Sequence, residues 1–247
     1  MKKILTLSVS VLLSAAAMGQ LKIGPMIGLN NTRFVYKGNA GYLRSDRFDV
    51  VPDFRLGVLA DVQLNRVLFF QPALLYARNS QRWNEFYNSS REEWLSMETL
   101  ELPLSLTLKP ETVSGNRFFG SGGLVPMLIL GGWAKLSTYN NTGFVNQVIT
   151  SVSDNYSNAA IAVKGEVGYE TKKGLALRVY AQKGFTNLWV NNTGSLTSMT
   201  YFNYGAGLSV FLNSGHSKKA VDKKEKKLER KKNVVRDAPR FRKQAKQ

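Results

Sequence analysis

The sequence has no cysteine and a single histidine, His216. Without cysteine the chain forms no disulfide and has no thiolate nucleophile, so an exported protein of this length must be held together by a large core or by closure of a sheet. One histidine cannot provide a pair of imidazole ligands, and His216 lies in a polar, lysine-rich segment where we interpret it as solvated. We therefore predict no catalytic residue, no metal site and no cofactor.

The sequence also lacks an apolar run long enough for a membrane-spanning helix. Its first apolar run, residues 4–17, follows two lysines and has the length of a signal-peptide core, and Ala17 and Gly19 are the small residues that a signal peptidase needs. We predict a signal peptide over residues 1–19 and hence export. Because later apolar runs are broken by Gly, Pro or charged residues, any membrane insertion must be by strands.

The chain instead has segments in which apolar and polar residues alternate. Leucine occupies every even position from Leu100 to Leu108, whereas Glu101, Ser105 and Lys109 fall at odd positions. This period of two predicts a β-strand with one aliphatic face. Alternation, or an apolar run between turn residues, predicts eight strands in all, over residues 21–30, 54–64, 67–76, 100–109, 118–132, 161–169, 175–182 and 201–212.

The predicted connections alternate between long and short. The short ones include residues 65–66 and 171–174, whereas residues 78–98 and 133–158 are long, polar and interpreted as loops. Outer-membrane barrels have long loops at one end and tight turns at the other. We predict an all-β fold, an eight-stranded antiparallel up-and-down transmembrane β-barrel over residues 20–213, located in the outer membrane.

The face opposite the leucines then points into the barrel. Eight strands leave an interior that side chains just fill, so charges there must pair with one another or with trapped water. Glu101 and Lys109 need partners such as Arg55, Asp61 or Arg178. The predicted interior charges are Arg55, Asp61, Glu101, Lys109, Lys164, Glu166 and Arg178, and the same faces carry Lys22 and Glu170. A membrane girdle is predicted for the tryptophans near strand ends, Trp83, Trp94, Trp133 and Trp189.

Four prolines fall inside predicted strands: Pro25, Pro72, Pro103 and Pro126. Proline has no N–H to donate to a neighbouring strand. Because a closed barrel has no edge strand, we expect each proline to mark a bulge or a strand end.

The formal charge of +17 is concentrated at the C-terminal end. Residues 214–247 contain 14 Lys and Arg against 4 Asp and Glu, a formal charge of +10. We predict a disordered or weakly helical basic tail in the periplasm, where the anions are peptidoglycan, lipid headgroups and acidic proteins, and where nucleic acid is not a partner. The residues predicted to contact an anionic surface are Lys218, Lys219, Lys223, Lys224, Lys226, Lys227, Arg230, Lys231 and Lys232.

Several short motifs resemble those of the outer-membrane β-barrel family often labelled porin-like or PorT-like. They are Leu100-Glu101-Leu102-Pro103-Leu104, Gln71-Pro72-Ala73-Leu74-Leu75-Tyr76, Gly122-Gly123-Leu124-Val125-Pro126, Arg178-Val179-Tyr180 and Gly184-Phe185-Thr186-Asn187. The resemblance covers about residues 21–212 and implies an eight-stranded outer-membrane barrel. One branch of the family is tied to protein secretion.

The predicted function is that of a non-enzymatic outer-membrane barrel. It would contact outer-membrane lipid and act through loop or periplasmic contacts, in secretion or in tethering the envelope to peptidoglycan or periplasmic proteins. Three alternatives stay open at this point: transport of small solutes as in a porin, an enzyme with its site in the loops, and a soluble exported lipocalin-like binding barrel. The last would place the leucines in a core and the charges in water.

Overall fold

The computed structural model describes residues 21–38, 48–49, 51–85, 90–110, 112, 115–140, 143–151, 156–190 and 196–212. The regular elements in these ranges are β1 (Leu21–Gly38), β2 (Phe48–Asp49), β3 (Pro52–Gln63), β4 (Leu68–Glu85), β5 (Ser90–Glu101), β6 (Leu104–Leu108), β7 (Arg117–Asn140), β8 (Gly143–Ser151), β9 (Ala159–Glu170), β10 (Leu175–Gly184) and β11 (Leu196–Val210). Within these ranges no helix is both long and apolar enough to cross a membrane. The predicted signal peptide and basic tail lie outside them.

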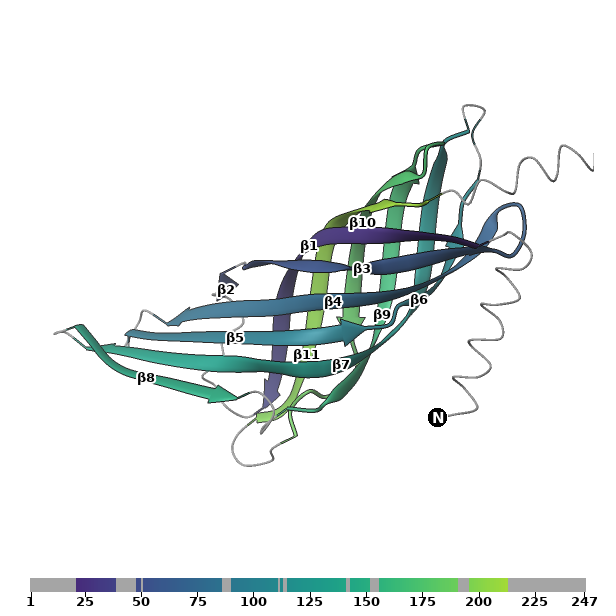
Figure 1. The fold of residues 1–247 in the computed structure, drawn as a ribbon. Coiled ribbons are helices and arrows are strands. Elements are labelled where there is room, and N and C mark those ends of the chain that lie inside the picture. The colour runs from purple at the N-terminus through teal and green to yellow at the C-terminus, as the bar shows by residue number, and fades with distance from the viewer. Residues whose placement is uncertain are drawn as a thin grey trace, which may run out of the picture. The chain divides into compact units, whose positions relative to one another are not determined.

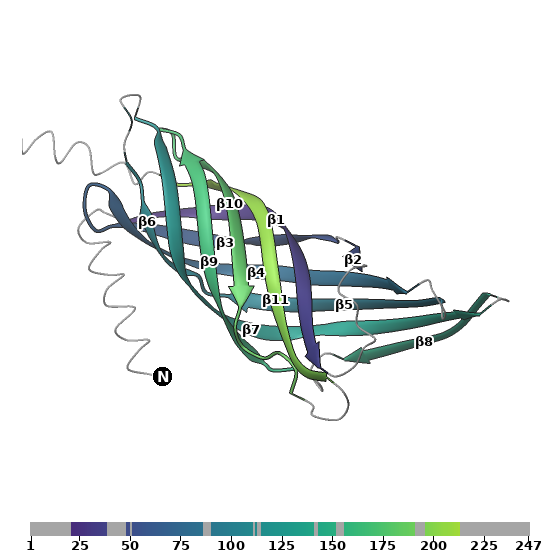
Figure 2. The ribbon, with the colours of Figure 1, turned by 180° about the vertical axis from the view of Figure 1, so that it is seen from behind.

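The strands form one sheet that closes on itself (Figures 1 and 2). Its path runs β4-β3-β1-β11-β10-β9-β7-β5, and pairing of β4 with β5 joins the two ends. Three positions in the ring hold two successive strands each: β2 and β3 beside β4, β5 and β6 between β4 and β7, and β8 and β9 beside β7. The described ring therefore has eight positions, and the predicted eight-stranded antiparallel barrel is confirmed.

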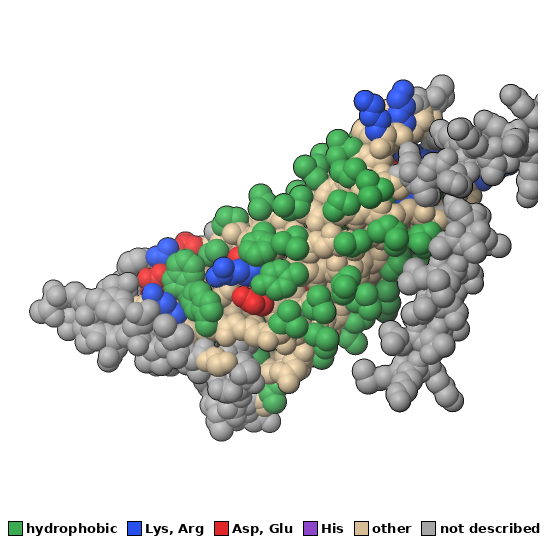
Figure 3. Space-filling model, in the orientation of Figure 1, with side chains coloured by type: hydrophobic (Ala, Val, Ile, Leu, Met, Phe, Trp, Pro, Cys, Tyr) green, Lys and Arg blue, Asp and Glu red, His purple; other side chains and the backbone are tan. Residues whose placement is uncertain are grey.

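Apolar side chains cover the outside of the ring. In β6, Leu104, Leu106 and Leu108 are exposed while the intervening Ser105 and Thr107 are buried. The same alternation runs through β3, β9 and β10, and Figure 3 shows apolar side chains spread over the outer face. An exposed apolar surface of this extent fits a hydrocarbon environment and not water.

The long connections are more regular than predicted. Because β4 and β5 pair from Leu75 with Glu101 out to Glu85 with Arg91, most of residues 78–98 forms a hairpin and not a loop. Likewise β7 pairs with β8 within residues 133–158. The loop interpretation was wrong there, since ladder hydrogen bonds join backbones and do not require alternating side chains. We call this region the hairpin sheet; it comprises residues 78–85, 90–98, 133–140 and 143–151.

A bulge in β7 marks the base of the hairpin sheet. Glu98 pairs with Gly131 and Thr99 pairs with Ile129, so the register of β7 with β5 shifts by one residue. Gly132 follows with φ 150°, and a Cβ added there would lie 2.2 Å from the carbonyl oxygen of Ser96. Glycine is therefore required where β7 leaves the apolar band.

Two prolines face the interruption between β5 and β6. Pro103 lies in that interruption, outside any strand, and its carbonyl accepts a 2.9 Å hydrogen bond from the N–H of Ala73. The carbonyl of Pro126 accepts a 2.8 Å hydrogen bond from the N–H of Leu102, so this residue also faces the interruption. The pairing of neighbouring strands is already interrupted between β5 and β6. The missing N–H groups of these two prolines therefore fall where the strand between β4 and β7 is irregular.

The other two prolines also lie beside gaps in a ladder. The register of β3 with β4 passes from Leu59 opposite Ala73 directly to Val62 opposite Phe70, and the omitted positions of β4 include Pro72. Pro25 precedes the first pair of β1 with β11. The expectation of a bulge or a strand end is confirmed for Pro103, which lies between β5 and β6. It is wrong for Pro25, Pro72 and Pro126, which lie inside β1, β4 and β7 with no register shift beside them. At these three positions the ladder to one neighbouring strand is interrupted instead.

Candidate functional site

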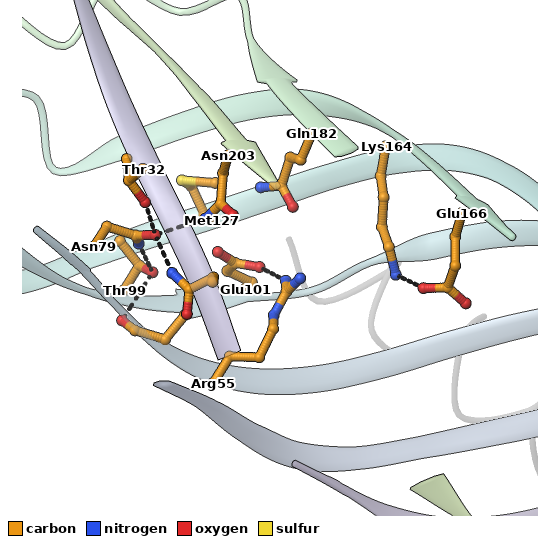
Figure 4. A network of polar contacts seen from close by, with 12 residues as sticks. Thr32, Arg55, Asn79, Thr99, Glu101, Met127, Lys164, Glu166, Gln182 and Asn203 are labelled. Atoms are coloured by element: carbon orange, nitrogen blue, oxygen red, sulfur yellow. Dashed lines mark hydrogen bonds and ion pairs between the residues drawn. The ribbon is translucent and has the colours of Figure 1, made fainter. Parts of the chain in front are cut away.

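The seven charged residues predicted for the interior are all buried. Arg55 and Lys109 have no exposed side-chain surface, and the others are at most 6% exposed. They come from β3, β5, β9 and β10 and from the residue that follows β6. Lys22 is half-buried and lies near the start of β1. Charges from separate strands therefore meet within the ring, as Figure 4 shows for Arg55 of β3 and Glu101 of β5.

Lys109 is the centre of one cluster. Its Nζ lies 2.8 Å from Oδ2 of Asp61 on β3 and 2.7 Å from Oε2 of Glu170 on β9. The ammonium also lies within 6 Å of the ring centroids of Phe69, Phe119 and Phe211. Two carboxylates and three aromatic faces compensate for the loss of water around this cation.

Arg178 is the centre of a second cluster. Its Nη1 lies 2.5 Å from Oε1 of Glu166, and its Nε donates a 2.9 Å hydrogen bond to Ser209. Glu166 also pairs with Lys164. Gln71 links the two clusters, because its Nε2 donates to Asp61 at 2.9 Å while its Oε1 lies 3.4 Å from Nη1 of Arg178. Gln71 belongs to β4, four ring positions from β10, so this contact crosses the lumen.

A separate ion pair joins Arg55 to Glu101, one of the pairings expected from the sequence. The guanidinium of Arg55 also lies 4.3 Å from the ring centroid of Tyr180 on β10. Nε and Nη1 of Arg55, Oε1 of Glu101 and the hydroxyl of Tyr180 have no hydrogen-bond partner within the described protein. Ordered water is the ordinary partner of such buried atoms.

Neutral amides and hydroxyls form a further layer that the sequence analysis did not identify. Oδ1 of Asn79 accepts hydrogen bonds from Asn203 at 2.7 Å, Thr32 at 2.9 Å and Asn30 at 3.1 Å. The amide nitrogen of Asn79 donates to Thr99 at 3.1 Å. These residues occupy inward positions, so the available signal was their alternation with apolar residues along β1, β4 and β11.

An apolar cluster fills the interior next to this layer. It consists of Phe34, Leu95, Met97, Val125, Met127, Ala160, Ala162, Leu188, Met199 and Tyr201. A small cavity of about 10 Å³, lined by Asn79 and Thr99 as well as by members of the cluster, separates the two, and it has room for about one water molecule. The described interior is therefore filled from its ionic part to its apolar part.

The four tryptophans divide between the inside and the outside. Trp83 and Trp189 pack against the interior apolar cluster, so the girdle prediction is corrected for these two. Trp189 also packs edge-on against Tyr156 with ring centroids 5.4 Å apart, and burial raises the pKa of the Tyr156 hydroxyl to about 12. Trp133 is half-buried on β7. For Trp94 and Trp133 the girdle stays a prediction.

The surface of the hairpin sheet is charged and polar where its side chains are described. Nε of Arg82 lies 2.7 Å from Oε1 of Glu92, and the guanidinium lies 5.1 Å from the ring centroid of Trp94. Nearer the apolar band, Nε of Arg78 donates a 3.0 Å hydrogen bond to Ser96. These are cross-strand pairs between β4 and β5, and they fit water and headgroups better than hydrocarbon.

A family model described as the outer membrane protein beta-barrel domain matches residues 14–190. The chain belongs to this family. Three solved structures that it resembles are outer-membrane proteins: Ail of Yersinia pestis in complex with sucrose octasulfate, OprG of Pseudomonas aeruginosa, and Neisserial surface protein A. No curated protein matches.

The sequence identity to each of these structures is low. For Ail the identity is 11% and the TM-score 0.41, over 78% of this chain and 99% of Ail. For OprG the identity is 13% and the TM-score 0.40, over 78% of this chain and 95% of OprG. For the neisserial protein the identity is 12% and the TM-score 0.35, over 77% of this chain and 96% of the neisserial protein.

Within the described part of this outer-membrane barrel, no group of three or more His, Cys, Asp or Glu residues is placed to hold a metal ion. His216 and the nine predicted tail residues Lys218, Lys219, Lys223, Lys224, Lys226, Lys227, Arg230, Lys231 and Lys232 lie outside the described residues. In the described interior, buried carboxylates and cations lie close enough to neutralise one another.

Proposed function

We propose that the protein is a closed, non-enzymatic outer-membrane barrel that acts through contacts made outside the apolar band. One set of these contacts is made by the hairpin sheet. A second set is made by the basic tail, residues 214–247, which contacts an anionic surface such as peptidoglycan or the acidic face of a periplasmic or secretion protein.

The filled lumen is the observation that carries this proposal. Arg55 and Lys109 lie within the ring with no exposed side-chain surface, and a water-filled path past them would leave them exposed. Contacts such as that of Gln71 with Arg178 join opposite walls. An eight-stranded barrel packed in this way has no route for a solute, which weighs against the porin alternative.

The outer face weighs against the soluble alternative. A lipocalin-like barrel in water would turn its apolar alternate residues inward. Here Leu106, Leu177 and Leu208, which lie on three different strands, are each about half exposed, while the positions beside them are buried and are polar or small. The hairpin sheet is the largest described part of the barrel that continues beyond this apolar face, and so it is the natural contact surface.

Two measurements on the full chain test the proposal. The folded protein should migrate differently on a gel before and after boiling, and it should give no stable conductance in a planar lipid bilayer. A large steady conductance of the unmodified protein would contradict the proposal, as would release of the protein from membranes by carbonate.

A further inference from the structure

The outer strand of the hairpin sheet pairs along one edge only. β8 pairs with β7 from Trp133 opposite Ser151 to Asn140 opposite Gly143. No other strand of the described chain pairs with β8. On that side the described pairing continues past Gly184 as far as the bridge of Tyr156 with Trp189, which lies beyond the end of β8 in the chain. Figure 1 shows β8 at the side of the sheet, beyond the closed ring. Alternate residues in the regular part of β8, residues 146–150, therefore direct backbone N–H and C=O groups away from β7.

We propose that this edge of β8 binds an extended segment of another protein, which adds to the hairpin sheet as one more antiparallel strand. The inference rests on the proposed function, because it identifies the contact surface and the kind of partner. Backbone hydrogen bonds would supply most of the affinity, as in other cases of strand addition to an exposed sheet edge.

The sequence of β8 supports this inference. Proteins ordinarily protect exposed edge strands with lysine, proline, bulges or very short length. Residues 143–151 read GFVNQVITS; they contain no charged residue and no proline, and four of the nine are β-branched. β8 does contain one bulge, at Val145, because Thr138 pairs with Asn146 whereas the next residue, Tyr139, pairs with Phe144. The regular edge that is suited to pairing is therefore residues 146–150.

The opposite edge of the hairpin sheet is protected and provides the contrast. There β2 has only two residues, Phe48 and Asp49, opposite Trp83 and Arg82 of β4. Asp49 is 54% exposed and lies 3.9 Å from Arg82. That edge is short and carries charges of both signs, so selectivity for the β8 edge follows from the chain itself.

Membrane geometry favours a different protein over a second copy of this chain. Two copies in one membrane point their hairpin sheets in the same direction, so their β8 strands could meet only in parallel. Parallel strands pair slightly less stably than antiparallel strands. In addition, two copies related by a two-fold axis parallel to their β8 strands would not form equivalent hydrogen bonds with each other, as a symmetric dimer requires. A separate segment has no such restriction. The regular edge, residues 146–150 at about 3.3 Å each, offers it a track of roughly 17 Å, and the uncharged track selects a segment rich in Val, Ile and Thr.

The test uses the full chain folded in lipid nanodiscs and a fluorescent peptide of alternating threonine and valine, seven residues long. The matched control peptide has proline at its central position. We expect saturable binding of the first peptide and none of the second. Val148→Lys and Ile149→Lys, at consecutive positions of β8, should each weaken binding at least tenfold, whereas Val190→Lys, at an exposed residue outside the strands, should not. Heat-modifiable migration of each variant verifies that the barrel has folded.

Three results would overturn the inference: no binding of the threonine-valine peptide, equal binding by the lysine variants, or disulfide-linked dimers of a Gln147→Cys variant without peptide, which would assign the edge to a second copy. Bilayer conductance separates this inference from the proposed function. A closed barrel that fails to bind the peptide refutes only the strand addition, whereas a conducting barrel refutes the proposed function itself.

Discussion

The ammonium of Lys109 lies 2.8 Å from the carboxylate of Asp61, a residue 48 positions earlier in the chain. The exposed fraction of each of these two side chains is 1% or less. The second carboxylate on the same ammonium, Glu170, comes from 61 positions later. Lys109 thus joins strands that are not neighbours in the barrel wall, and its removal should affect the whole ring.

Replacing Lys109 with methionine should lower the free energy of unfolding by about 3–5 kcal/mol, because Asp61 and Glu170 would be left buried without their cation. Urea unfolding in lipid vesicles, followed by gel migration, measures this. Lys173→Met, on an exposed turn, is the matched control and should change stability by less than about 0.5 kcal/mol. Equal effects of the two substitutions would show that the buried cluster does not stabilise the barrel.

Arg55 and Glu101 should be energetically coupled. Each single alanine substitution leaves a buried charge behind, whereas the double substitution removes both, so the double variant should be more stable than the sum of the two losses predicts. A coupling energy of about 1–3 kcal/mol is expected from unfolding of the four proteins of a double-mutant cycle. Simple additivity would mean that water, and not the partner, solvates these groups.

The outward leucines should be sensitive to charge. Leu106→Arg would place a guanidinium in hydrocarbon and should cost about 2–4 kcal/mol, whereas Val190→Arg, outside the strands, should cost less than about 1 kcal/mol. The comparison is made by unfolding from vesicles whose lipids differ in chain length. If both substitutions are tolerated equally in every lipid, the apolar band does not contact hydrocarbon.

Removing the tail should abolish binding to an anionic surface. A chain that ends at Asn213 loses residues with a formal charge of +10, so it should no longer sediment with isolated cell wall at low salt, whereas the intact chain should sediment and be released as salt is raised. Heat-modifiable migration of the truncated chain provides the folding control. Equal sedimentation of the two proteins would show that the tail is not the tether.

Strand alternation was sufficient to predict the ring of eight positions and the inward charges. The pairs of Lys109 with Asp61 and of Arg55 with Glu101 were among those expected, because a lumen that side chains fill leaves few partners for each charge. The pair of Lys109 with Glu170 depends on register and could not be chosen from sequence alone.

The alternation of apolar and polar residues does not predict the strands beyond the apolar band, because there the outward face of the sheet no longer contacts hydrocarbon. Beyond Arg78 the outward positions are polar, so residues 78–98 lost the period of two and were interpreted as a loop, although β4 and β5 continue to pair there. The same change of environment explains Trp83. It was assigned to a girdle from its place near a strand end, but the continued strand directs it toward the apolar cluster.

The three-strand connection made by Lys109 also constrains the order of assembly. β3 supplies Asp61 early and β9 supplies Glu170 late, so Lys109 can pair with Asp61 first, but its ammonium gains its second carboxylate only when the C-terminal strands arrive. Until then the charges must stay hydrated, and dehydration of the lumen and closure of the ring become a single late event. The barrel is thus expected to insert as a unit, with no stable half-barrel on the way.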